Sequence, residues 1–178
     1  NSYIDGTLPE CLFSMPKLNQ LYAGGNRVVG KFPSTNISSN LTKISLPYNS
    51  MYGTLPSSFG ENSNIILLDL SNNRISGDIS MFKNSNKVNK NLDLSLSVNN
   101  LSGDIPIALR SLKNIDILAG NVFSCSQDRD TIPTNDPSVD SYDCGSNTLN
   151  RYMYFFMIVF ALMLLVVLYI FYKDSVII

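Results

Sequence analysis

Few residues of this chain are of a type that performs chemistry. The sequence contains no histidine, so it lacks the side chain that most often serves as a general base near neutral pH or as a metal ligand. Its three cysteines, Cys11, Cys125 and Cys144, lie too far apart for a Cys-x-x-Cys redox or zinc motif. We therefore expect no enzyme, no cofactor and no metal site.

Two segments resemble ligand-binding motifs but fit them poorly. Five aspartates lie close together near the end of the polar part of the chain: Asp128, Asp130, Asp136, Asp140 and Asp143. Their spacing matches no calcium loop, so a solvated acidic surface is expected. Residues 25–31 resemble a phosphate-binding loop, but Phe32 stands where a serine or threonine would hold magnesium.

Charge and length narrow the possible functions further. The 178 residues include 13 basic and 14 acidic side chains, which gives a formal net charge of −1 at pH 7. A protein that neutralises nucleic-acid phosphates would carry a basic excess. Nucleic acid is therefore not an expected partner. The length allows one ordinary domain and an appendage.

A repeated pattern fills most of the chain. It reads Asn-x-apolar-x-Gly, followed two residues later by an apolar side chain and often by proline. The pattern begins at Asn26, Asn49, Asn73 and Asn99, after a partial copy at residues 4–9. The glycines are separated by 24, 23, 24 and 26 residues: Gly6, Gly30, Gly53, Gly77 and Gly103. Such a period indicates one structural coil per repeat.

Each position of the repeat has a structural role. A short alternating stretch upstream of each asparagine, such as Leu68-Asp-Leu70, predicts a strand with one buried face. The asparagines point inward, where the amides bond backbone groups left unpaired by the bend. We expect Asn26, Asn49, Asn73 and Asn99 to form a structural ladder. The glycine permits a backbone conformation that is costly for other residues.

Residues 41–56 read Leu-x-x-Ile-x-Leu-x-x-Asn-x-Met-x-Gly-x-Leu-Pro, which resembles the plant-type leucine-rich repeat, LxxLxLxxNxLxGxIPxxLxxLxx. The resemblance implies an α/β solenoid, a right-handed leucine-rich-repeat coil with a short parallel β-sheet on its concave face. About four to five repeats, the first partial, would occupy residues 1–123. Ala23, Ser80 and an insertion at residues 83–91 depart from the template, so we expect an irregular fourth coil.

The resemblance also implies where a partner would bind. Side chains between the inward-facing strand positions would point outward from the concave sheet. They are Tyr22, Lys43, Ser45, Tyr48, Leu67, Asp69, Asp93, Ser95 and Val98. The set carries little charge and includes two tyrosines, which can anchor a protein interface. Simple solvent exposure is the alternative for this face.

The repeat ends at residues 121–125, where a cysteine replaces the glycine. We expect residues 124–150 to form a C-terminal cap and juxtamembrane linker. A disulfide between Cys125 and Cys144 would close the cap in an oxidising compartment, with two unpaired thiols as the alternative. Cys11 has no evident partner and is expected to pack at a convex position.

Residues 151–173 predict a transmembrane helix. The 21 residues from Tyr152 to Tyr172 carry no charge, and as a helix they would span roughly 31 Å, close to the thickness of a bilayer core. Tyrosine and phenylalanine rings lie at both ends, as at membrane interfaces. Membrane lipid or other transmembrane helices would then surround residues 152–172.

The orientation depends on three N-glycosylation sequons, which begin at Asn36, Asn40 and Asn100. Together with the cap cysteines they predict repeats on the extracellular or luminal side. Residues 174–178 would form a short cytoplasmic tail, too small for a folded signalling module. The chain also begins inside a repeat, so we expect upstream repeats or a neighbouring protein to cover that edge.

Two functions fit these features. The first is a membrane-anchored protein-interaction module, receptor-like or adhesion-type, without a catalytic domain of its own. Its protein partners would bind at the concave face or at the open N-terminal edge. The second is a structural accessory subunit of a larger membrane complex, with its helix packed against other subunits. The receptor-like function rests on resemblance to the family, because the sequence contains no derived site.

Overall fold

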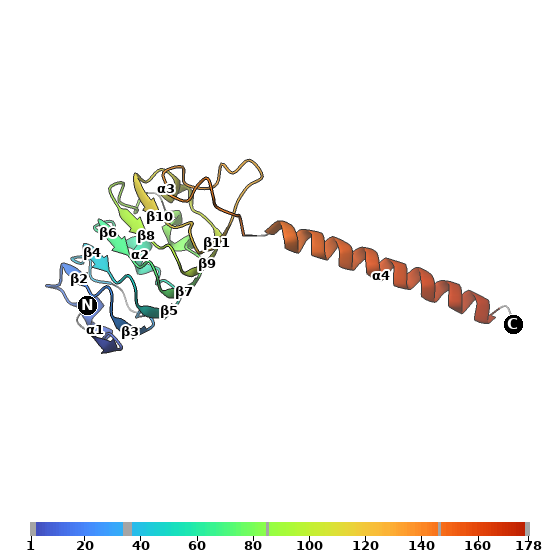
Figure 1. The fold of residues 1–178 in the computed structure, drawn as a ribbon, viewed down its shortest axis with the longest axis horizontal. Coiled ribbons are helices and arrows are strands. Elements are labelled where there is room, and N and C mark those ends of the chain that lie inside the picture. Colours follow the sequence, from blue (N-terminus) through green and yellow to red (C-terminus); the bar gives the residue numbers. More distant parts are fainter. Residues whose placement is uncertain (1–2, 34–36, 85, 146, 177–178) are drawn as a thin grey trace. The chain divides into compact units, whose positions relative to one another are not determined.

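The computed structural model describes residues 3–33, 37–84, 86–145 and 147–176 (Figure 1). The chain divides into two compact units, Asn1–Gly145 and Ser146–Ile178. We call them the repeat unit and the helical unit. The repeat unit contains both sheets and the short helices, and the helical unit contains the single helix α4 (Asn147–Val176).

Strands of successive coils stack into a five-stranded parallel sheet. In spatial order the strands are β10 (Asn114–Asp116), β8 (Asp93–Ser95), β6 (Leu67–Asp69), β4 (Lys43–Ser45) and β2 (Gln20–Tyr22). We call this the concave sheet, after the predicted face to which it corresponds. The central residues of neighbouring strands are paired, as in Leu68 with Leu94, and both leucines are fully buried. The predicted solenoid is confirmed, with five strands in this sheet.

A second parallel sheet runs beside the first (Figure 1). Its six strands, in spatial order, are β1 (Asp5–Gly6), β3 (Arg27–Gly30), β5 (Ser50–Gly53), β7 (Arg74–Gly77), β9 (Asn100–Asp104) and β11 (Val122–Ser124). Strands β3, β5, β7 and β9 begin directly after the ladder asparagines and contain the rest of the repeated pattern, for which no strand was predicted. They form strands because each coil exposes backbone groups that the next coil can pair. The pattern's glycines have positive φ, for example 84° at Gly53, as predicted.

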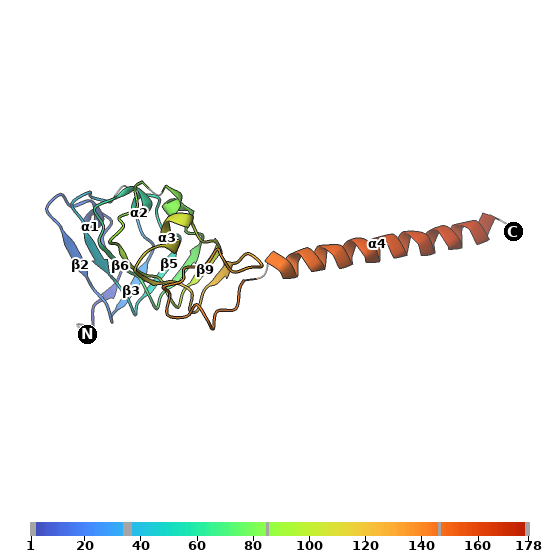
Figure 2. The same ribbon diagram turned by 90° about the horizontal axis from the view of Figure 1, so that it is seen from above.

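Short helical turns lie on one side of the repeat unit (Figure 2). They are α1 (Cys11–Ser14), α2 (Ser58–Glu61), the 3-10 helix η1 (Ser80–Lys83) and α3 (Ile107–Arg110). Beneath them, the rings of Phe13 and Phe59 each pack edge-to-face against Phe32, with centroids 5.8 and 5.3 Å apart. The prediction that Cys11 is a packed side chain is wrong, because Cys11 is exposed at the start of α1.

The insertion at residues 83–91 leaves the sheets regular. Strand β8, which follows it, pairs in register with β6, so that Asp93 lies opposite Leu67. The same strand also pairs in register with β10. The longer coil differs mainly in its helical segment, where η1 stands in place of an α-helical turn. The expected irregularity of the fourth coil is therefore confined to residues outside the two sheets.

The ladder asparagines connect each coil to the preceding one. The side-chain oxygens of Asn49, Asn73, Asn99 and Asn121 accept hydrogen bonds from backbone N–H groups of the preceding coil at 2.9–3.0 Å. The amide nitrogen of Asn99 donates to the carbonyls of Leu70, Leu96 and Ser97, one in the preceding coil and two in its own. Asn26 has the corresponding bond to the Ile4 N–H, at 3.1 Å.

The C-terminal cap supplies the hydrogen-bond acceptors that β10, at the end of the concave sheet, would otherwise find in a further strand. In the earlier coils the N–H that follows each strand bonds the next strand, as from Leu96 to the Asp116 carbonyl at 2.8 Å. After β10, the carboxylate of Asp136 accepts the N–H groups of Ile117 and Leu118 instead, at 2.7 and 3.1 Å. Asp136 is therefore buried, and its predicted place on a solvated acidic surface is wrong. The other four aspartates of that cluster are exposed.

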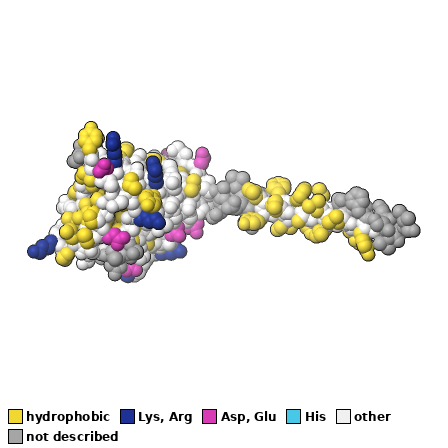
Figure 3. Space-filling view, turned by 90° about the horizontal axis from the view of Figure 1, so that it is seen from below, with side chains coloured by type: hydrophobic (Ala, Val, Ile, Leu, Met, Phe, Trp, Pro, Cys, Tyr) yellow, Lys and Arg dark blue, Asp and Glu magenta, His cyan; other side chains and the backbone are white. Residues whose placement is uncertain are grey.

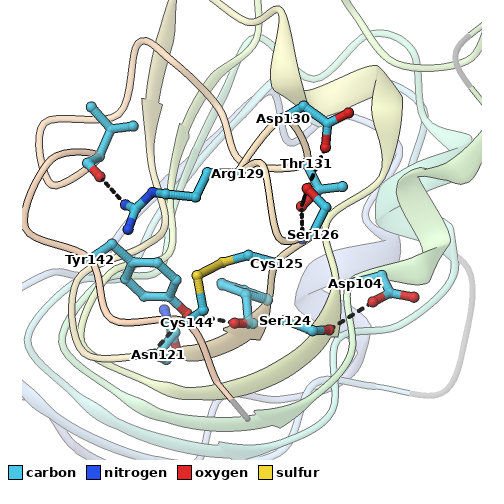
Figure 4. Close-up of a disulfide and its surroundings, with 12 residues drawn as sticks. Asp104, Asn121, Ser124, Cys125, Ser126, Arg129, Asp130, Thr131, Tyr142 and Cys144 are labelled. Carbon is cyan, nitrogen blue, oxygen red and sulfur yellow. Dashed lines mark hydrogen bonds between the residues drawn. A yellow bond between two sulfur atoms is a disulfide. The ribbon is translucent and has the colours of Figure 1, made fainter. Parts of the chain in front are cut away.

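A disulfide between Cys125 and Cys144 closes the cap (Figure 4). Near it the buried Tyr142 hydroxyl donates to the carbonyls of Phe123 and Asn121, at 3.1 and 3.3 Å. Burial raises the pKa of Tyr142 above its ordinary value of 10.0, so the hydroxyl keeps the proton that it donates. The predicted pairing of the two cysteines is confirmed.

Helix α4 covers the segment for which a transmembrane helix was predicted. In the described part of the chain, no helix combines the length and the apolar character needed to cross a membrane. The membrane-spanning role of residues 151–173 thus gains no support from the structure and stays a prediction. The described side chains of α4, at positions 153–166, 168, 169 and 172, are exposed. They form an apolar surface in Figure 3.

The ladder makes a direct stability prediction. Replacing Asn99→Ala should lower the free energy of unfolding by about 3 kcal/mol, because four backbone groups in a buried site lose their partner. Asn100→Ala is the matched control, since Asn100 is the next residue and is exposed; it should change stability by less than about 0.5 kcal/mol. Urea unfolding followed by circular dichroism would measure both. Equal effects of the two changes would contradict the ladder's role.

Candidate protein-interaction face

The strand register of the concave sheet arranges outward-facing side chains in two rows. The first row contains Gln20, Lys43, Leu67, Asp93 and Asn114. The second contains Tyr22, Ser45, Asp69, Ser95 and Asp116. All seven predicted strand residues lie in these rows. Gln20, Asn114 and Asp116 were missed, because the first and last strands depart from the leucine template and only the spacing could have revealed them.

A third row follows the strands. It consists of the residues that precede the ladder asparagines, and all five have positive φ: Gly25, Tyr48, Asn72, Val98 and Gly120. The chain turns there to direct the next side chain inward, and the row's N–H groups bond across the coils, for example Val98 to Ala119 at 2.7 Å. Tyr48 and Val98 are 65% and 49% exposed. Both were predicted for this face, but their backbone conformation was not.

Val98 is under backbone strain. Its φ is 54°, a left-handed conformation that is uncommon for residues other than glycine, asparagine and aspartate and unusual for a β-branched side chain. The four equivalent positions hold glycine twice, at Gly25 and Gly120, asparagine at Asn72 and tyrosine at Tyr48. Strain of this kind is often retained where a side chain serves a function.

Hydrogen bonds fix the orientation of two acidic side chains on the face. Asp69 accepts from the backbone N–H and the hydroxyl of Ser71, at 3.2 and 2.8 Å. Asp116 accepts from the hydroxyl of Ser97 at 2.8 Å. These serines hold the carboxylates in one rotamer, which lowers the entropy cost of engaging a partner.

Charge and aromatic character are unevenly distributed along the face. The two tyrosines, Tyr22 and Tyr48, and the cation of Lys43 belong to the coils of β2 and β4. The coils of β6, β8 and β10 each contribute one aspartate: Asp69, Asp93 and Asp116. One half of the sheet is therefore aromatic and basic, and the other half is acidic.

The remaining predicted sites fall elsewhere. Asn40 and Asn100 are exposed, whereas Asn36 lies outside the described residues. Residues 27–30 of the segment that resembles a phosphate loop form strand β3. Within the described residues, no group of three or more cysteine, aspartate or glutamate side chains could hold a metal ion.

Comparisons with known proteins agree with this arrangement. The family model for the Leucine Rich Repeat matches residues 64–85. Among solved structures, the leucine-rich-repeat ectodomain of the receptor kinase SOBIR1 from Arabidopsis thaliana is 28% identical, with a TM-score of 0.58 over 67% of this chain and 65% of that chain. A sequence comparison with curated proteins gave no match.

Two complexes also match. One is the BIR3–SERK2 complex from Arabidopsis thaliana, at 30% identity and a TM-score of 0.58, over 68% of this chain and 64% of that chain. The other is the ectodomain of the Arabidopsis receptor kinase HAESA with an IDA peptide hormone ligand. It is 30% identical with a TM-score of 0.56, over 72% of this chain and 22% of that chain. The chain thus spans less than two thirds of the length of each of these three matched chains.

The class that the fold and the repeat model define is the leucine-rich-repeat solenoid. The chain is a leucine-rich-repeat protein of the plant type, as its likeness to receptor-kinase ectodomains shows.

The strain at Val98 can be measured. Val98→Asn copies the residue of the preceding coil and should raise the free energy of unfolding by about 1 kcal/mol, because asparagine tolerates the left-handed conformation. Val29→Asn is the control, since Val29 is 41% exposed on a strand of the second sheet and should gain nothing. Thermal unfolding of both variants would show the difference. A loss of stability in Val98→Asn would mean that Val98 is not strained.

Proposed function

We propose that this protein is a receptor-like recognition module whose concave sheet binds a protein or peptide partner, without catalysis of its own. The supporting observation is the in-register set of outward-facing residues across five strands, bordered by the exposed Tyr48 and Val98. Parallel strands hold such rows rigidly, so a partner finds a preformed surface. The BIR3–SERK2 and HAESA–IDA structures are complexes with a protein and with a peptide hormone, and they favour the same class of partner here.

The distribution of side chains indicates what such a partner carries. Aromatic rings at Tyr22 and Tyr48 offer large contact areas with few rotatable bonds. Asp69, Asp93 and Asp116 place one anionic group on each of three neighbouring strands, which favours a cationic segment through electrostatic complementarity. We expect an extended segment with apolar side chains over the β2–β4 half and basic side chains over the β6–β10 half.

Helix α4 is proposed to anchor the module in a membrane, with the repeats on the extracellular or luminal side. Two observations support this. The 21 residues from 152 to 172 carry no charge, and large apolar side chains such as Phe156 and Leu165 are over 60% exposed in the helix. Such a surface is costly in water and favourable in lipid. The exposed sequons at Asn40 and Asn100 favour the proposed side.

A role as accessory subunit of a membrane complex is the second candidate. It is favoured by a groove of about 450 Å³ on α4 that is lined only by apolar side chains, among them Phe156, Phe160 and Met163. Methionine and phenylalanine fill irregular packing surfaces well, so another transmembrane helix could occupy this groove. The two candidates differ in whether the chain is isolated alone or in fixed stoichiometry with other subunits.

The concave-face proposal is tested by replacing a residue of one coil with the residue at the equivalent position of the next coil. Tyr48→Asn copies Asn72 of the next coil and should preserve the fold, but it removes an aromatic anchor and should weaken partner binding about thirtyfold. Tyr52→Ser is the control, because Tyr52 is exposed on the second sheet and Ser76 stands in the same place one coil later. Binding would be measured by interferometry against a partner captured with the wild-type chain. Equal affinities of the two variants would exclude the concave face.

The anchoring proposal is tested by extraction of cell membranes. The full chain should stay in the pellet at alkaline pH and leave it only with detergent, since apolar burial in lipid is insensitive to charge. Changing Leu164→Arg and Leu165→Arg in the middle of α4 should release it. Recovery of the wild-type chain in the alkaline supernatant would contradict a membrane span.

A further inference from the structure

A groove lies at the end of the longer coil. Residues 83–91 belong to the coil with the 26-residue glycine spacing. Their last part, with Val88 and Lys90, forms one wall of a groove of about 460 Å³. The other wall comes from α3 and the residues after it, including Ile107, Leu112 and Lys113. The groove thus lies between two adjacent coils, on residues outside both sheets.

The wall formed by the longer coil is ordered by its own hydrogen bonds. The Asn89 amide donates to the Ser63 carbonyl of the preceding coil at 3.1 Å. The Asn89 side-chain oxygen accepts the N–H of Asn91 at 3.0 Å, and its backbone carbonyl accepts the N–H of Leu92 at 3.0 Å. These bonds hold the segment that carries Lys90, so the groove does not depend on a partner to form.

The groove combines apolar surface with unbalanced positive charge. Ile107 is 72% exposed at the start of α3, whereas Leu112 is buried. Residues 79–92 and 105–115 contain five basic side chains and no acidic one: Lys83, Lys87, Lys90, Arg110 and Lys113. Arg110 donates twice to the Ile105 carbonyl, at 3.0 and 3.2 Å, which fixes α3. Lys90 and Lys113 are exposed in the groove itself.

We propose that this groove binds an acidic peptide segment of a partner protein, in which carboxylates flank an apolar side chain. The apolar side chain contacts Ile107 and the half-buried Val88, and the carboxylates pair with Lys90 and Lys113. Charge complementarity favours an anionic occupant, because the residues that line the groove include Lys90 and Lys113 and no acidic side chain. The apolar lining favours a peptide over a purely polar polyanion, which would leave Ile107 in water. This site is separate from the concave sheet and does not rest on the function proposed for it.

The test uses a labelled peptide of alternating glutamate and leucine as the probe, with fluorescence anisotropy of the full chain in detergent. Lys90→Gln combined with Lys113→Gln should weaken binding about tenfold, and Ile107→Asn should weaken it about fivefold. Lys17→Gln combined with Arg74→Gln is the control for net charge, since both side chains are exposed and lie outside the groove; it should change binding less than twofold. Peptides with glutamine for glutamate, or serine for leucine, should bind at least fivefold more weakly.

Several results would overturn the proposal. The first is that the probe does not bind, and the second is that both charge variants lose the same amount of affinity for it. The third is that the serine peptide binds as tightly as the leucine peptide, which would indicate a general polyanion site. Binding of phosphatidylserine vesicles that is lost in the Lys90 and Lys113 variant, without binding of the peptide, would assign the groove to a lipid surface instead. Tyr48→Asn should leave probe binding unchanged, so failure here is distinguishable from failure of the concave-face proposal.

Discussion

The asparagine ladder is the constraint on which the rest of the repeat unit depends. Each coil turns sharply after its strand, and the turn leaves backbone carbonyls and N–H groups without partners inside the molecule. One amide per coil satisfies them, as Asn73 does by donating to Leu46, Leu70 and Ser71 and accepting from Met51. Because each amide bonds two coils, it also fixes their register. Both sheets and the buried leucines between them follow from that register.

The same constraint explains why some features were predictable from the sequence and others were not. The strands, the ladder and the cap disulfide follow from residue types at fixed spacing, and all are present. The second sheet was missed because each of its strands is only two to five residues long and several end in glycine, which strands disfavour. These residues form strands only because neighbouring coils bring identical segments together. Tertiary context also decides the burial of Asp136. Its carboxylate accepts the backbone N–H groups of Ile117 and Leu118, whose equivalents in earlier coils bond to the next strand.

The turn that directs the asparagine inward has a further consequence for the surface. It forces the preceding residue into a left-handed conformation, which glycine or asparagine would adopt at least cost. At Tyr48 and Val98 the chain instead keeps exposed side chains at the edge of the concave sheet. The left-handed conformation of Tyr48 and Val98 lowers the free energy of unfolding, while their side chains add exposed contact area. That combination of strain and exposure supports the proposed recognition role of this face over simple solvent exposure.

The central claim is that partners bind the rows of the concave sheet. The most direct measurement is photo-crosslinking in native membranes, with a benzophenone amino acid at Ser45, Asp69 or Ser95 in one set and at Ser76 or Ser102 of the second sheet in the other. Crosslinks to one protein from the first set alone are predicted. Crosslinks only from the second sheet, or at equal yield from both sets, would contradict the account.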